Sequence, residues 1–94
     1  MVLVNRVALV TGAARGMGKA IALALAEAGA HVAAVDIDGP GAESTGIAVR
    51  ELGRQSLAIE ADVGSVDEID RIVKETVDLF SRVDILVNNA GVTR

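Results

Sequence analysis

The sequence predicts an α/β fold in which four parallel strands, in the spatial order 3-2-1-4, form a sheet with helices on both faces. Short aliphatic runs alternate with longer segments of helical periodicity, in the order β-α-β-α-β-α-β, and turn residues mark most junctions. The first run has only apolar residues in its middle, as expected of a strand that is covered on both faces. Helical crossovers between parallel strands predict half of a doubly wound sheet.

Four aliphatic runs predict the strands. They cover residues 6–11, 31–37, 56–61 and 83–88. The sequence ends six residues after the last of them, so we expect a single unit over residues 1–94 that is truncated after its fourth strand. Strands 3 and 4 would then form the two edges of the sheet. The fourth run is apolar in its centre, so we expect this edge to self-associate or to be covered by a missing C-terminal half.

Residues 17–28 predict the first helix. Its apolar positions recur at helical spacing, and Gly29 follows where a left-handed C-cap is wanted. These positions are Met17, Ala20, Ile21, Ala24, Leu25 and Ala28. The other side of the segment is also mostly apolar, so we expect this helix to be largely buried.

The second helix is predicted to begin at Pro40 and to end at Leu52. It is the weakest of the predicted elements because it contains Ser44, Thr45 and Gly46.

Residues 66–80 predict the third helix. Ser65 followed by Glu68 has the spacing of a capping box. One apolar stripe predicts the buried face of this helix and consists of Val66, Ile69, Val73, Val77 and Phe80.

Composition excludes several classes of protein. Apolar residues make up 51% of the sequence and the net charge is only −4, which argues against disorder and against a nucleic-acid partner. Cysteine is absent and histidine occurs once, so neither disulfides nor a metal centre are expected. No apolar run approaches the length of a membrane span, and Arg6 interrupts any signal-peptide pattern. We therefore expect a cytoplasmic protein.

Ligands of doubly wound sheets bind beyond the carboxyl ends of the strands. The first strand is followed by the segment Thr11 to Gly18, which has the spacing T-G-x-x-x-G-x-G. Its glycines would let the backbone approach a pyrophosphate, and the N-terminus of the next helix would supply free N–H groups. A tight turn with glycine for packing is the alternative. The spacing fits neither a Walker loop nor the common G-x-G-x-x-G fingerprint.

One acidic residue lies at the end of the second strand and another directly follows the third. Asp36 could accept hydrogen bonds from both ribose hydroxyls of an adenosine, or it could be a helix cap, although Asp38 is better placed for that turn. Asp62 could accept from an adenine amino group while Val63 packs on the ring; the alternative is a dipole or capping residue, a role that Ser65 fills better.

The fourth strand is followed by Asn88-Asn89-Ala90-Gly91. Its two amides could bond neighbouring strand-end loops, and its small residues leave room for a ribose. An asparagine-rich turn without a ligand is an equal alternative.

Together these four segments resemble the short-chain dehydrogenase/reductase family, and they lie in the family's order along the whole chain. The segment 88–94 is also similar to the acyl-carrier reductase branch. The resemblance implies a Rossmann-type half fold that binds NAD. It places Gly12, Gly16, Met17 and Gly18 at the phosphates, Asp36 and Ile37 at the adenine ribose, Asp62 and Val63 at the adenine, and Asn89, Ala90 and Gly91 at the middle of the cofactor.

The chain departs from the family in its catalytic residues. The family uses a Ser, a Tyr and a Lys that lie downstream of N-N-A-G, whereas this sequence contains no tyrosine and no serine at a matching position. We therefore expect the chain alone to be inactive. It is then the cofactor-binding half of a dehydrogenase, a stand-alone nucleotide-binding module, or a folded fragment without activity.

The preferred cofactor depends on two residues. Asp36 would repel the 2′-phosphate of NADP, whereas Arg15, just before the second glycine of the loop, could attract it. Because repulsion excludes a ligand and one flexible arginine only attracts it, we expect selectivity for NAD.

Overall fold

The computed structural model describes residues 2–89. All seven predicted elements are present, each within two residues of its expected bounds. They are β1 (Val7–Thr11), α1 (Gly16–Glu27), β2 (His31–Asp36), α2 (Gly39–Glu51), β3 (Ser56–Glu60), α3 (Val66–Phe80) and β4 (Ile85–Val87).

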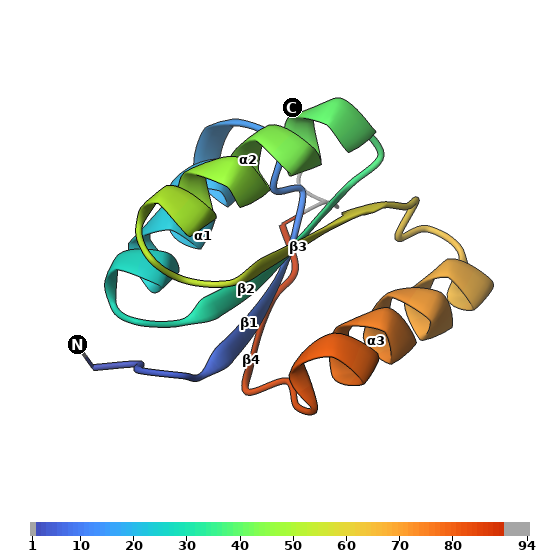
Figure 1. Cartoon of the computed structure of the whole chain (residues 1–94). Helices are drawn as coiled ribbons and strands as arrows, with labels where there is room; N and C mark the ends of the chain where they lie inside the picture. The colour runs from blue at the N-terminus through green and yellow to red at the C-terminus, as the bar shows by residue number, and fades with distance from the viewer. Residues whose placement is uncertain (1, 90–94) are drawn as a thin grey trace.

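The four strands form one parallel sheet in the order β3-β2-β1-β4. Helices α1 and α2 cover one face of this sheet and α3 covers the other (Figure 1). The predicted fold class, strand order and two-sided helix arrangement are therefore confirmed.

Two apolar clusters fill the space between the sheet and its helices. On the α1/α2 side the strands contribute Ala8, Val10, Val32 and Ala34; on the α3 side they contribute Leu9, Ala33, Val35 and Ile59. Successive side chains of a strand point to opposite faces, so β1 and β2 supply both clusters. Every residue of β1 is buried, as expected of a strand that is covered on both faces.

The expectation that α1 is largely buried is wrong. Its buried residues are Gly18, Ala22 and Ala26, whereas Met17 is 67% exposed. These three small residues are spaced by four, so they form a row that lets the helix lie close to the sheet. The predicted apolar positions lie beside that row, because a helix that is apolar all round does not specify which side faces the sheet.

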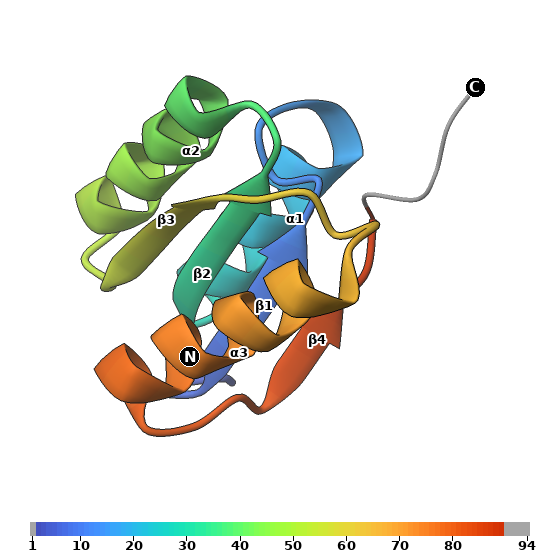
Figure 2. The same ribbon diagram turned by 90° about the vertical axis from the view of Figure 1, so that its right-hand side faces the viewer.

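Most of the predicted apolar stripe of α3 is not buried either, although Phe80 is partly buried and packs against the cluster on that side. Ile72 and Thr76 are its buried residues, while Val66 is 73%, Ile69 44%, Val73 43% and Val77 41% exposed. In the described chain α3 is the single helix on its face of the sheet (Figure 2), and Leu86 of β4 is 65% exposed. One helix cannot shield both its own apolar face and that part of the sheet.

The predicted capping box of α3 does not form. Ser65 is the N-cap residue, but among residues 2–89 its side chain makes no capping hydrogen bond. Glu68 instead accepts hydrogen bonds from Arg71, and a backbone hydrogen bond joins it to Asp62. The ion pair with Arg71, three residues further along the same helix face, competes with the capping geometry.

Strand β4 is shorter than expected. Asp84 precedes it, donates its N–H to the carbonyl of Val7 and accepts from the Val7 N–H through its carboxylate. This side-chain bond replaces a regular ladder contact, so strand pairing begins only at Ile85.

No helix within residues 2–89 is long and apolar enough to cross a membrane. The cytoplasmic location stays a prediction.

Candidate functional site

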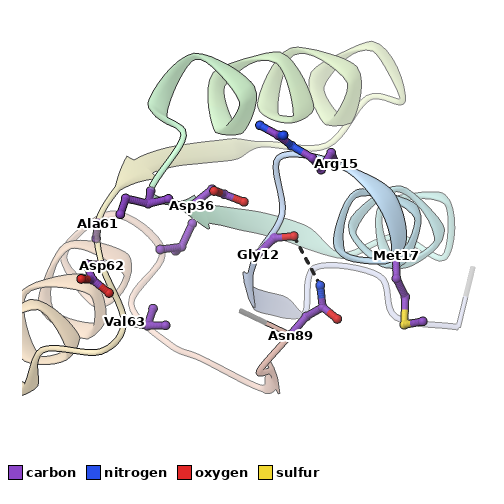
Figure 3. Close-up of a pocket in the computed structure, with 10 residues that line it drawn as sticks. Gly12, Arg15, Met17, Asp36, Ala61, Asp62, Val63 and Asn89 are labelled. Carbon is purple, nitrogen blue, oxygen red and sulfur yellow. Dashed lines mark hydrogen bonds between the residues drawn. The ribbon is translucent and has the colours of Figure 1, made fainter. Parts of the chain in front are cut away.

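A pocket of about 410 Å³ lies at the carboxyl ends of the strands (Figure 3). Its walls come from the segments that follow β1, β2, β3 and β4. The lining residues are Gly12, Arg15, Met17, Val35, Asp36, Ile37, Ala61, Asp62, Val63 and Asn89. Eight of the twelve predicted site residues are among them. The volume lies within the range of small-molecule sites.

The N-terminus of α1 belongs to this pocket wall. Arg15 is its N-cap residue, and within residues 2–89 no side chain caps this helix and no acidic residue lies in its first turn. The other two helices differ, since Asp38 caps α2 and two acids, Asp67 and Glu68, lie in the first turn of α3. The positive end of the α1 dipole is therefore left for a negatively charged ligand.

Gly16 and Gly18 are not lining residues, which refines their predicted role at the phosphates. A Cβ on Gly18 would lie 1.9 Å from the carbonyl oxygen of Gly12 and 2.9 Å from Nδ2 of Asn89. Gly18 therefore lets α1 pack directly on the loop that precedes it. Gly16 has φ +57°, a left-handed conformation at the start of α1 that favours glycine.

The loop between β1 and α1 is held by residues distant in sequence. Ala13 donates its N–H to the carbonyl of Val35, and the buried hydroxyl of Thr45 donates to the carbonyl of Ala13 at 2.7 Å. From the sequence, Thr45 is expected only to weaken the second helix. The local sequence pattern holds no signal for this contact, because it joins residues that are 32 positions apart.

Asp36 connects this loop to the end of β2. Its Oδ2 accepts from the N–H of Ala14 at 3.0 Å, and its Oδ1 accepts from the N–H of Asp38 at 2.9 Å. Each carboxylate oxygen can accept a further hydrogen bond, so the side chain stays available to a ligand in the pocket. The expectation that Asp38 serves the turn is confirmed, because its Oδ1 accepts from the N–H of Gly41 at the start of α2.

Arg15 is paired with Asp38 at the entrance of the pocket. Its Nη2 lies 2.5 Å from Oδ2 of Asp38. The N–H of Gly41 and the Arg15 guanidinium lower the pKa of Asp38 below its usual range, so this carboxylate is charged at neutral pH. Arg15 is the only cationic residue among the described residues that line the pocket.

The segment after β3 forms the wall beside Ile37. Oδ1 of Asp62 accepts from the N–H of Gly64 in a tight turn, and Val63 packs against the apolar cluster on the α3 side. Ile37, which lines the pocket, is 70% exposed. Val35 and Ala61 also line the pocket, although neither was predicted; both lie at strand ends.

The two asparagines after β4 bond the loop after β1, as one of the two interpretations expected. Thr11 donates its hydroxyl to Oδ1 of Asn88 and accepts from the N–H of Asn89 at 3.0 Å. Nδ2 of Asn89 donates to the carbonyl of Gly12 at 3.4 Å (Figure 3). The predicted site residues Ala90 and Gly91 lie outside the described residues.

Fold and pocket together define an α/β protein of the doubly wound, Rossmann-like class. The family model for short chain dehydrogenases matches residues 6–94. The chain therefore belongs to the short chain dehydrogenase family.

Similar proteins agree with this assignment. The chain is 47% identical over 93 residues to a 3-oxoacyl-[acyl-carrier-protein] reductase of Synechocystis, covering 98% of the chain and 38% of that relative. It is 49% identical to a (2S)-[(R)-hydroxy(phenyl)methyl]succinyl-CoA dehydrogenase subunit of Thauera aromatica, covering 96% of the chain and 36% of the relative.

A solved short chain dehydrogenase from Mycobacterium paratuberculosis, bound to NAD, superposes with a TM-score of 0.92 at 35% identity, covering 99% of the chain and 39% of that structure. A hydroxysteroid dehydrogenase from Escherichia coli superposes with a TM-score of 0.91 at 38% identity, over 96% of the chain and 38% of that structure. The chain thus spans less than two fifths of the length of these relatives.

Proposed function

We propose that the pocket at the strand ends binds NAD(H). The observation that carries this proposal is the first turn of α1, which opens on the pocket with no side-chain cap and no acid among the described residues. This turn suits a pyrophosphate, whose negative charge the helix N-terminus stabilises. The NAD-bound relative from Mycobacterium paratuberculosis supports the same assignment.

The pocket residues receive distinct roles in this proposal. Gly12 and Met17 border the pyrophosphate beside α1, where Gly16 and Gly18 shape the turn, and Arg15 lies toward the adenine ribose. Asp36 accepts from the adenine ribose hydroxyls, and Ile37 packs beside that ribose. Asp62 and Val63 contact the adenine, and Asn89, with Ala90 and Gly91, borders the middle of the cofactor.

The proposal includes selectivity for NAD over NADP. A 2′-phosphate next to the Asp36 carboxylate would be repelled, and this carboxylate is held in place by two backbone N–H groups. Titration calorimetry of the chain with NAD⁺ and NADP⁺ tests it. Equal or tighter binding of NADP⁺ would contradict the selectivity, and absence of binding by either cofactor would contradict the assignment of the pocket.

In a longer protein that contains this chain, we propose hydride transfer between the nicotinamide and an alcohol or carbonyl substrate. The nicotinamide supplies the hydride chemistry when bound, while this chain's residues bind and orient the cofactor. A positioned acid/base contributes about 10²–10⁴-fold to such a reaction, and the chain has no tyrosine to serve as one. Cofactor-dependent turnover by the purified 94-residue chain would contradict the expected inactivity.

We further propose that the uncovered side of β4 and α3 is a contact surface. It includes a groove of about 150 Å³ lined by Leu9, Thr11, Val63, Ile69, Ile72, Val73, Leu86 and Asn88. Leu86 of β4 is 65% exposed there, and β4 has a hydrogen-bonded neighbour on one side only within residues 2–89. In the isolated chain a second copy would cover this surface; in a longer protein, residues beyond position 94 would do so.

A further inference from the structure

We propose that Asp38 strengthens the selectivity for NAD over NADP by positioning Arg15. Arg15 is the only cationic residue among the described residues that line the pocket. Asp38 binds its guanidinium, so this group is not available to a 2′-phosphate. This inference rests on the proposed NAD(H) site and deepens it. Asp38 does not line the pocket itself, so it acts on the choice of cofactor through Arg15.

Three contacts fix Asp38 in place. Its N–H donates to Oδ1 of Asp36, its own Oδ1 accepts from the N–H of Gly41, and its Oδ2 pairs with Nη2 of Arg15. Asp38 therefore contacts the end of β2 through its N–H, and its carboxylate joins the start of α2 to the glycine-rich loop. The Arg15 guanidinium is thus paired with a carboxylate that two backbone hydrogen bonds of Asp38 hold in position.

The first turn of α2 is shaped around this pair. A Cβ on Gly41 would lie 2.5 Å from Oδ2 of Asp38 and 2.6 Å from the Cβ of Ala14. A larger residue at position 41 would displace the carboxylate oxygen that holds Arg15. The glycine therefore makes room for both the Asp38 side chain and the loop residue that precedes Arg15.

The ion pair competes directly with a 2′-phosphate. Arg15 lines the pocket near Asp36, the residue proposed to face the adenine ribose. To bind a phosphate there, its guanidinium must leave Asp38. The Arg15 side chain is 78% exposed and that of Asp38 33%, so solvent weakens the pair. Releasing Arg15 is thus expected to change the affinity for a 2′-phosphate by about three- to fivefold, the upper part of the range of an exposed ion pair.

The test is a double-mutant cycle on the 94-residue chain. Calorimetry measures the Kd of NAD⁺ and of NADP⁺ for the wild type, Asp38→Asn, Arg15→Gln and the double variant. Asparagine keeps an oxygen that can accept from Gly41, so the cap of α2 is retained. Asp78→Asn is the charge-matched control, since it removes one carboxylate from an exposed pair on α3, across the sheet from α2.

We expect Asp38→Asn to tighten NADP⁺ about three- to fivefold and to leave NAD⁺ within about twofold. Arg15→Gln should abolish this gain, and Asp78→Asn should produce none. A gain that persists without Arg15 would mean that Asp38 merely repels phosphate, which overturns the positioning role. An unchanged Kd for NADP⁺ overturns it as well.

If the proposed function is wrong, the wild type binds neither cofactor. The role of Asp38 is then contradicted as well. Thermal unfolding of each variant checks folding. If Asp38→Asn is unfolded, Asp38→Ser, which also provides an N-cap oxygen, replaces it in the cycle.

Discussion

At the scale of single residues, the conformation of the loop after β1 depends on a glycine without a Cβ and on a buried threonine hydroxyl. Gly18 lies against the Gly12 carbonyl, and Thr45 donates to the carbonyl of Ala13. Both residues act on the backbone that the proposed pyrophosphate would contact. Changes at these positions should therefore affect cofactor binding together with stability.

Gly18→Ala should destabilise the chain by roughly 1–3 kcal/mol and weaken NAD⁺ binding at least about tenfold. The added Cβ would collide with the Gly12 carbonyl, so α1 or the loop must shift. Thermal unfolding and calorimetry measure the two effects. Gly53→Ala is the control, because φ is +85° there while the space is open, so it should cost stability without changing the Kd. NAD⁺ affinity of wild-type strength in Gly18→Ala would refute this role.

Thr45→Val should destabilise the chain by about 1–3 kcal/mol, because a buried carbonyl loses its hydroxyl donor while side-chain volume is kept. The loop would also lose an anchor to α2, so NAD⁺ binding should weaken. Thr76→Val is the matched control: Thr76 is equally buried, but its hydroxyl donates to Ile72 of its own helix. Equal effects of the two substitutions on the Kd would contradict the anchoring role.

At the scale of elements, the pairing of β1 with β4 depends on charge as well as on the strand ladder. Oδ2 of Asp84 accepts from the N–H of Val7 at 2.8 Å, and Oδ1 pairs with Arg82 and Arg6. Hydrogen bonds from Arg82 and from the Val7 N–H lower the pKa of Asp84. The folded state therefore favours the charged carboxylate.

Asp84→Asn should lower the unfolding midpoint at pH 7, with the difference from wild type shrinking on acidification. A carboxyl whose pKa is lowered by folding stabilises above its unfolded pKa of about 3.9 and loses this contribution as pH falls through the lower folded value. Thermal scans between pH 7 and pH 2.5 measure the difference. A constant difference across that range would show that the charge of Asp84 does not contribute.

At the scale of the whole molecule, the two faces of the sheet are unequally covered. Two helices pack on one face and α3 alone packs on the other within residues 2–89, which leaves an apolar groove between α3 and β4. The exposed stripe of α3 continues this groove through Ile69 and Val73. Contiguous exposed apolar surface of this kind marks interaction sites, whereas monomers normally expose apolar side chains singly.

Leu86→Lys should shift the isolated chain from self-associated species toward monomer, since it places a charge on the edge strand. Size-exclusion chromatography with light scattering over a concentration series measures this, with refractive-index detection because the chain has no tryptophan or tyrosine. Ile47→Lys, at an exposed aliphatic residue of α2 on the opposite face, should leave the association unchanged. A wild type that stays monomeric at every concentration would contradict the proposed surface.

The sequence by itself determined the elements, their order and the segments that form the pocket. Strand and helix periodicity are local properties. Asp36, Asp62 and Asn89 lie at or just beyond strand ends that a parallel sheet brings to one edge. The tertiary structure decided which helix faces are buried, because α1 is apolar on both sides and α3 has more apolar surface than the described sheet covers. It also decided the contacts of Thr45 with Ala13 and of Arg15 with Asp38, which join residues 32 and 23 positions apart. Such pairs leave no periodic signal in the sequence; they exist only because the sheet brings the ends of its strands together.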